Sequence, residues 1–215
     1  MAERSRFEAG TSVRVLVCAA TGLCRLLELL WSRRNMANTG PAQEGRWSRR
    51  TFPLIVALHS AVIAGTLFFG DSRIRPGWLG AFVAAQPLRV WTLLTLGQWW
   101  NARGRVAEAT KVVTGGPYRY VRHPNYAVVA VELVSLPAAF GLSRLAAAAT
   151  LLNTALLAVR IQEEEAMLFE LPGYRAHFGA KPRFLPSLAQ LSFKSRGKAP
   201  KGRAAVMTSG ARRDS

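Results

Sequence analysis

Two short polar segments carry the residue types that could do chemistry in this chain. Residues 114–126 read TGGPYRYVRHPNY, and residues 160–165 read RIQEEE. Together they supply tyrosines, a histidine, arginines and carboxylates, which donate and accept hydrogen bonds and offer charge and aromatic surface. If the fold brings them together, they predict a pocket for a ligand that has both charged and aromatic parts.

The apolar residues between these segments predict that the two do meet. Residues 126–142 and 145–161 are almost entirely apolar, and only a short connection around Gly141–Arg144 separates them. Such a connection is typical of two antiparallel neighbouring helices, whose outer ends emerge on the same side. Pro124 suits the first turn of the earlier helix. We therefore expect a helical hairpin with both polar segments at its open end.

Three further apolar stretches precede this hairpin, at residues 13–31, 52–69 and 78–96. A helix that crosses a bilayer needs roughly 17–25 mostly apolar residues. The sequence thus predicts an all-α polytopic membrane protein with about five transmembrane helices, the last two forming the hairpin. Arg25 and Glu28 lie three residues apart and are expected to pair, and Arg89 is expected to face protein or lipid headgroups.

Composition favours a membrane protein over the other classes that a basic chain suggests. Half of the residues are hydrophobic, and the formal net charge is +17. The basic residues flank apolar stretches and are not interleaved with aromatic residues as on a nucleic-acid surface, so we expect membrane lipids and no nucleic acid as partners. Cys18 and Cys24 lack metal-binding spacing, and no metal site is expected. No cleavage site of a removable signal peptide follows the first apolar stretch.

Basic residues concentrate in residues 32–50, 97–122 and after residue 161, which predicts that these parts face the cytoplasm. The pocket would then face the cytoplasm too. We predict three regions: helices and a basic loop at 1–109, the pocket-forming domain at 110–188, and a basic disordered tail at 189–215.

The polar segments, in this order around an apolar hairpin, resemble the isoprenylcysteine carboxyl methyltransferase family and its bacterial members. The matching residues read Gly-x-Tyr at 116–118, Arg-His-Pro-x-Tyr at 122–126, Arg-x-x-Glu-Glu-Glu at 160–165 and Pro-Arg-Phe-Leu-Pro at 182–186. The resemblance covers about 75 residues. It implies S-adenosyl-L-methionine as methyl donor and an oxygen of a lipophilic or lipidated molecule as acceptor.

The resemblance also implies roles for individual residues. Arg160 resembles the arginine that faces the acceptor, and His123 is the other candidate catalytic residue. A phenol acceptor would be helped by a general base, for which His123 and Glu132 are candidates, whereas a carboxylate acceptor needs none. The donor-binding residues implied are Thr110, Lys111, Val112, Val113, Tyr118, His123, Pro124, Asn125, Tyr126 and Glu164.

Two alternatives stay open from the sequence. A phospholipid N-methyltransferase would use a similar hairpin, and Arg160 would then contact a phosphate. A membrane protein without catalytic activity would bind no donor and would recruit partners through its basic tail. Glu132 and Asn153 are expected to make polar contacts between helices rather than to act in catalysis.

Overall fold

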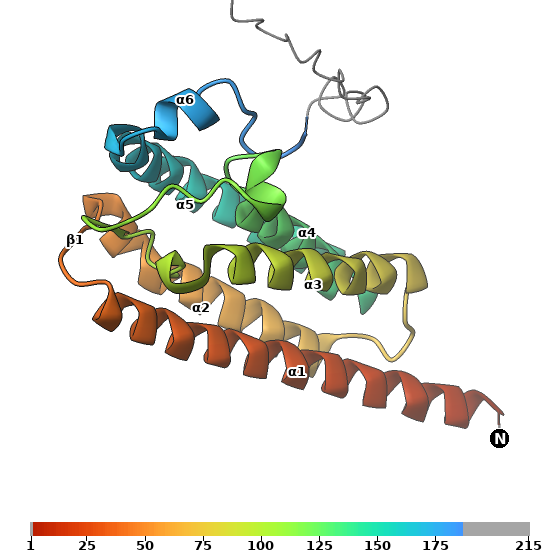
Figure 1. The fold of residues 1–215 in the computed structure, drawn as a ribbon. Helices are drawn as coiled ribbons and strands as arrows, with labels where there is room; N and C mark the ends of the chain where they lie inside the picture. Colours follow the sequence, from red (N-terminus) through yellow and green to blue (C-terminus); the bar gives the residue numbers. More distant parts are fainter. Residues whose placement is uncertain (1, 187–215) are drawn as a thin grey trace, which may run out of the picture.

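The structure of this chain, a computed structural model, describes residues 2–186 and is mostly helical (Figure 1). The prediction of a tail at residues 189–215 lies outside the described residues. Two antiparallel two-residue strands, β1 and β2, pair Ala42 with Ala107 and Gln43 with Val106. The elements in chain order are α1 (Ala2–Asn38), β1 (Ala42–Gln43), α2 (Arg46–Phe69), α3 (Pro76–Leu96), the 3-10 turn η1 (Gly97–Trp99), β2 (Val106–Ala107), the 3-10 turn η2 (Gly116–Arg119), α4 (Pro124–Ala139), α5 (Ser143–Glu170) and α6 (Tyr174–Phe178).

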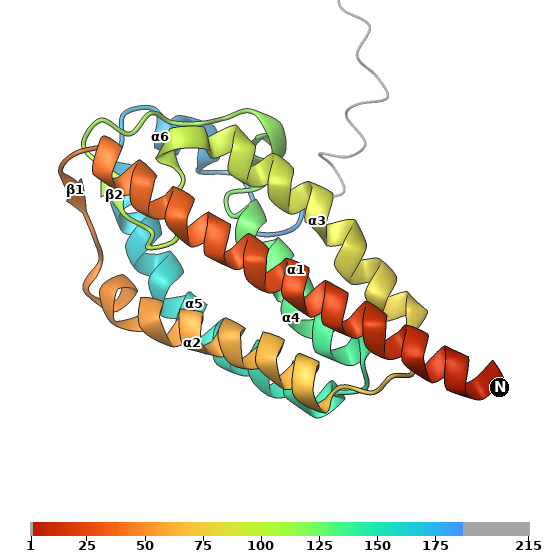
Figure 2. The ribbon, with the colours of Figure 1, turned by 90° about the horizontal axis from the view of Figure 1, so that it is seen from below.

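Helix α4 forms the centre of the bundle. It packs against α3, α5 and α2, while α1 packs against α2 (Figures 1 and 2). Val129 and Leu133 of α4 join Val62 of α2 and Ala149 of α5 in one buried apolar cluster. Because α4 is enclosed by its neighbours, most of its inward residues are buried. The polar groups at its N-terminal end are therefore held in fixed surroundings.

Helices α4 and α5 run antiparallel with a reversal at Phe140–Leu142. The Tyr126 hydroxyl near the start of α4 donates to the Glu164 carboxylate near the end of α5. Helices α2 and α5 are antiparallel as well, because the backbone N–H groups of Trp47 and Ser48 donate to Glu163 while Gly65 lies beside Leu145. Three helices thus bring their polar ends to one end of the bundle.

The outer surface of the bundle is apolar, as expected of an integral membrane protein. Helices α2 and α5, and α3 with its continuation to Trp99, are long and apolar enough to cross a bilayer, and α4 is a shorter apolar helix. Leu16, Phe69 and Leu151 are exposed by 70%, 78% and 73%. Of the five predicted spans, those that correspond to α2, α3 and α5 are long and apolar enough to cross a bilayer. The 37 residues of α1 form one helix that extends far beyond the predicted stretch at 13–31.

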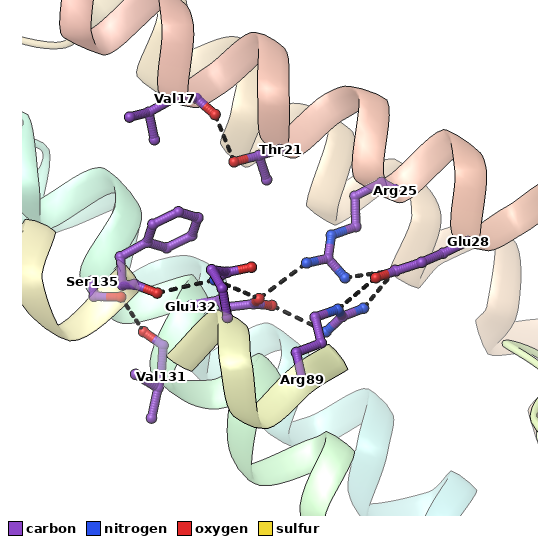
Figure 3. A network of polar contacts seen from close by, with 10 residues as sticks. Val17, Thr21, Arg25, Glu28, Arg89, Val131, Glu132 and Ser135 are labelled. Carbon is purple, nitrogen blue, oxygen red and sulfur yellow. Dashed lines mark hydrogen bonds and ion pairs between the residues drawn. The ribbon is translucent and has the colours of Figure 1, made fainter. Parts of the chain in front are cut away.

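A buried network of ion pairs joins α1, α3 and α4 in the interior of the bundle (Figure 3). Arg25 donates to Glu28 at 2.7 Å and to Glu132 at 3.0 Å, and Arg89 donates to the same two carboxylates at 2.7 and 3.1 Å. Gln86 adds a hydrogen bond to Glu132 at 3.0 Å. The predicted pairing of Arg25 with Glu28 and the interhelical role of Glu132 are confirmed, and Arg89, which was expected to face protein or lipid headgroups, faces protein.

Candidate functional site

A cavity of about 570 Å³ lies between α1, α2 and α5, with α3 and α4 also contributing to its wall, and is closed by residues 99–126 and by α6. This volume lies within the range of cavities that hold small molecules. Its wall is polar at the end formed by the two polar segments, residues 114–126 and 160–165. Apolar side chains of α2, including Phe52, Ile55 and Val56, line the part nearest to those segments.

One side of the polar end is built around Glu164. The Tyr126 hydroxyl donates a short hydrogen bond to its carboxylate, and Tyr118 lies nearby in the same wall. Burial raises the pKa of the Tyr118 hydroxyl well above its usual value, and the negative charge of Glu164 raises it further. Tyr118 is therefore protonated at neutral pH and offers a hydrogen-bond donor beside a carboxylate.

His123 also lines the cavity, and its ring is held by contacts on two sides. Its Nε2 lies 3.1 Å from a carboxylate oxygen of Glu165, and its ring stacks on Tyr126 with centroids 5.3 Å apart. Glu165 also pairs with Arg122 at 3.2 Å and Arg183 at 2.6 Å. His123 is only 5% exposed, so this hydrogen bond fixes the orientation of the imidazole beside Glu164 and Tyr126.

The segment around Arg183 closes this side by pairing with the backbone of the histidine motif. Arg122 donates its backbone N–H to Pro182 at 3.0 Å, and His123 donates to Arg183 at 2.8 Å. The Pro-Arg-Phe-Leu-Pro segment is thus fastened to the start of α4. The sequence indicated this segment only through its resemblance to the family motif. Hydrogen bonds between backbone groups do not require particular side chains, so they cannot be predicted from residue types.

Arg160 is the buried cation of the site. It is 4% exposed, forms no ion pair with a carboxylate of the described residues, and has no hydrogen-bond partner for its Nε there. Its Nη2 donates to the backbone carbonyl of Ala102 at 2.5 Å, and its guanidinium lies 6.0 Å from the Tyr126 ring. Burying a guanidinium without a carboxylate is costly, so its remaining donors are suited to an anionic ligand.

Helix α1 holds the loop that contacts Arg160. Asn35 donates to the carbonyls of Gly97 at 3.0 Å and Trp100 at 2.7 Å, and Ser32 accepts from the backbone N–H of Ala102 at 2.9 Å. Both side chains are buried. Gly104 completes the loop with a φ of 67°, which favours glycine, and a Cβ there would lie 3.1 Å from the Arg160 Nη2. The run Ser32-Arg33-Arg34-Asn35 also resembles bacterial family members, but the sequence did not assign Ser32, Asn35 or this loop to the site.

The structure places almost all residues expected at the site in the wall of one cavity. Pro124 is buried in the first turn of α4 and does not line it. Glu132, a candidate base, lies in the ion network rather than in the wall. The lining residues among those expected are Thr110, Lys111, Val112, Val113, Tyr118, His123, Asn125, Tyr126, Arg160 and Glu164.

Comparison with known proteins places part of the chain in a family. Residues 78–170 match the isoprenylcysteine carboxyl methyltransferase (ICMT) family, and this match confirms the assignment made from the motifs. The matched part includes α4, α5 and both polar segments.

Two curated relatives are similar over longer stretches. The Uncharacterized protein YpbQ of Bacillus subtilis (strain 168) is 29% identical over 153 residues, which cover 68% of this chain and 90% of the relative. The Nickel-cobalt-cadmium resistance protein NccN of Alcaligenes xylosoxydans xylosoxydans is 29% identical over 133 residues, which cover 60% of this chain. The chain spans only 62% of the length of that second relative.

Proposed function

Because residues 78–170 belong to the isoprenylcysteine carboxyl methyltransferase family, we propose that this integral membrane protein uses S-adenosyl-L-methionine to methylate a carboxylate or phenol oxygen of a lipophilic acceptor. The observation that carries the proposal is the arrangement of Arg160 and Glu164. A buried guanidinium without an ion pair and a carboxylate bonded to a tyrosine line the same cavity.

The polar end of the cavity fits the methyl donor. When bound, the donor supplies an electrophilic methyl group on a sulfonium cation, together with an ammonium, a ribose and an adenine. Glu164 offers a carboxylate for positive charge, and the side-chain oxygen of Asn125 is buried without a partner among the described residues. Tyr118 and Tyr126 offer aromatic surface, which attracts cations and stacks on bases.

Arg160 is suited to hold the acceptor. A guanidinium binds a carboxylate through two parallel hydrogen bonds, which fix both its position and its orientation. Methyl transfer requires mainly that the attacking oxygen is aligned with the bond that breaks, so orientation contributes directly to rate. A carboxylate is already anionic at neutral pH and needs no proton removed.

A phenol acceptor would need help, since its pKa is about 10. His123 is the candidate for that role, because it lies in the cavity wall and its ring is oriented by Glu165. Glu132 is fully engaged by Arg25, Arg89 and Gln86 and is not proposed as a base. We propose that the site faces the cytoplasm, where the donor is made.

The test is to offer purified protein and isotopically labelled donor to native lipid and metabolite extracts and to identify the labelled product by mass spectrometry. A labelled methyl ester or aryl methyl ether supports the proposal. A labelled methylamine on a phospholipid would instead establish N-methylation. S-adenosylhomocysteine is the donor without its methyl group. If the preparation yields no labelled product and does not bind S-adenosylhomocysteine, the alternative of a binding protein without catalytic activity is favoured.

A further inference from the structure

One face of α5 lines the cavity from Asn153 to Leu168. Asn153, Leu157, Arg160 and Glu164 all lie in the wall, at spacings of four, three and four residues that place them on one side of a helix. Seven residues separate Asn153 from Arg160, which corresponds to about 10 Å along the helix axis. The cavity therefore continues about two helical turns deeper than the proposed methyl-transfer site.

A second polar side chain meets Asn153 at this depth. His59 lies on α2, which runs antiparallel to α5, and it lines the same cavity. The contacts of Trp47 with Glu163 and of Gly65 with Leu145 set the register of the two helices, and this register brings His59 and Asn153 to the same level. Between this level and Arg160 the wall on the side of α2 and α5 is apolar and includes Ile55, Val56 and Leu157, whereas Arg25, Glu28 and Arg89 line the cavity from α1 and α3. Along α2 and α5 the cavity is thus polar at both levels and apolar between them.

Each of these two side chains keeps one polar atom without a hydrogen-bond partner in the part of the chain that the structure describes. Asn153 is 3% exposed and its Oδ1 has no hydrogen-bond partner among the described residues, and the same holds for the buried Nε2 of His59. A buried polar group without a partner costs about 1–3 kcal/mol. The neighbouring Arg25 and Glu132 are, in contrast, bonded to each other, and Glu132 also accepts from Arg89.

We propose that His59 and Asn153 form a second recognition site in the acceptor cavity, which binds a hydroxyl group that the acceptor carries about 10 Å from its methylated oxygen. A hydroxyl fits both side chains at once, because it can donate to the Asn153 Oδ1 while it accepts from the His59 Nε2–H. This inference rests on the proposed function, since Arg160 sets the position of the reacting oxygen.

The experiment uses the full chain in lipid nanodiscs, saturated with S-adenosylhomocysteine. Two probes are compared, 10-hydroxyoctadecanoic acid and octadecanoic acid, whose carboxylate suits Arg160 and whose hydroxyl, where present, lies roughly 10 Å along the extended chain. Their dissociation constants are measured by calorimetry for the wild type, His59→Leu and Asn153→Leu. Thr154→Leu is the matched control, because Thr154 is exposed on the outer side of α5 next to Asn153.

The measured quantity is the ratio of the two dissociation constants, because partition of the acids into the bilayer cancels when this ratio is compared between variants. We expect His59→Leu and Asn153→Leu each to reduce the preference for the hydroxy acid by about 3- to 10-fold, as for one buried hydrogen bond. Thr154→Leu keeps the preference of the wild type.

An equal ratio in the wild type and both cavity variants, or failure of both acids to bind, would overturn the second recognition site. Binding of S-adenosylhomocysteine to every variant shows that each is folded. If the wild type does not bind S-adenosylhomocysteine, the proposed function itself fails, whatever the ratio for the acids.

Discussion

At the scale of single residues, the three consecutive glutamates at the end of α5 show how one helix distributes three roles. Glu163 accepts from the first backbone N–H groups of α2, Glu164 faces the cavity and bonds to Tyr126, and Glu165 holds His123 and Arg183. Consecutive helical residues point about 100° apart, so neighbours in sequence serve different surroundings. The candidate site therefore depends on the helical phase of α5.

Arg160 leads to the first prediction. Arg160→Gln is expected to reduce methyl transfer to extract acceptors by about 10- to 100-fold, because hydrogen bonds to a charged group contribute about 1.5–3 kcal/mol. The dissociation constant of S-adenosylhomocysteine should change little. Both are measured on purified protein, with Arg144→Gln at the exposed far end of α5 as the control. A variant that loses donor binding but keeps turnover at saturating donor would refute this role.

The sequence predicted which residues of the motifs meet, but not how each is held. The order of the two segments around an apolar hairpin was sufficient to bring His123, Tyr126, Arg160 and Glu164 to one cavity wall. It could not show that Glu165 rather than Glu164 bonds His123, since this choice depends on helical phase. His59 lies alone in an apolar stretch, and only packing against α5 places it in the wall.

At the scale of elements, α1 positions the site without carrying a reacting group. Its buried Asn35 and Ser32 hold the loop whose Ala102 carbonyl accepts from Arg160. The chain of contacts runs from α1 through the loop to α5. The helical stretches were predictable from apolar length, but this loop was not, because its structure depends on hydrogen bonds to a helix more than sixty residues away in sequence.

The second prediction concerns this positioning. Asn35→Ala removes two hydrogen bonds to the loop and should reduce the turnover number more than the affinity for S-adenosylhomocysteine, because Arg160 loses its fixed partner. Asn35→Asp cannot donate and should behave in the same way. Equal losses of turnover and donor affinity in Asn35→Ala would indicate general loss of structure instead. The comparison requires full kinetics at saturating donor.

The third prediction concerns the ion network in the interior. Glu132→Leu leaves Arg25 and Arg89 with fewer carboxylate partners in a buried place and should lower the free energy of unfolding by about 3–5 kcal/mol. Denaturant titration in detergent micelles measures this. Glu8→Leu is the control, because its pair with Arg4 is exposed and surface pairs contribute about 0–1 kcal/mol. Equal stability of both variants would contradict a structural role of the network.

At the scale of the whole molecule, the cavity is formed where the polar ends of α2, α4 and α5 meet, while the outer surface stays apolar. Under the proposed function, the acceptor would enter the apolar part of the cavity and the donor would bind at its polar end. The lining residues all lie between Gly22 and Phe178. All lining residues in the part of the chain that the structure describes therefore precede residue 189.

The fourth prediction follows from that placement. A chain that ends before Ala189 should keep its donor affinity and its turnover in detergent within experimental error, because every cavity-lining residue among residues 2–186 is retained. The same truncation would abolish function if the tail recruited partners. Turnover and S-adenosylhomocysteine binding of the truncated and full chains are measured side by side.

The most direct test of the central claim is equilibrium binding of S-adenosylhomocysteine to the full chain, to Glu164→Gln and to Thr154→Leu. We predict saturable binding by the wild type and by Thr154→Leu, and an affinity at least about 10-fold weaker for Glu164→Gln, because a hydrogen bond to a charged carboxylate contributes about 1.5–3 kcal/mol. Unchanged binding by Glu164→Gln, or no binding by the wild type, would contradict the account.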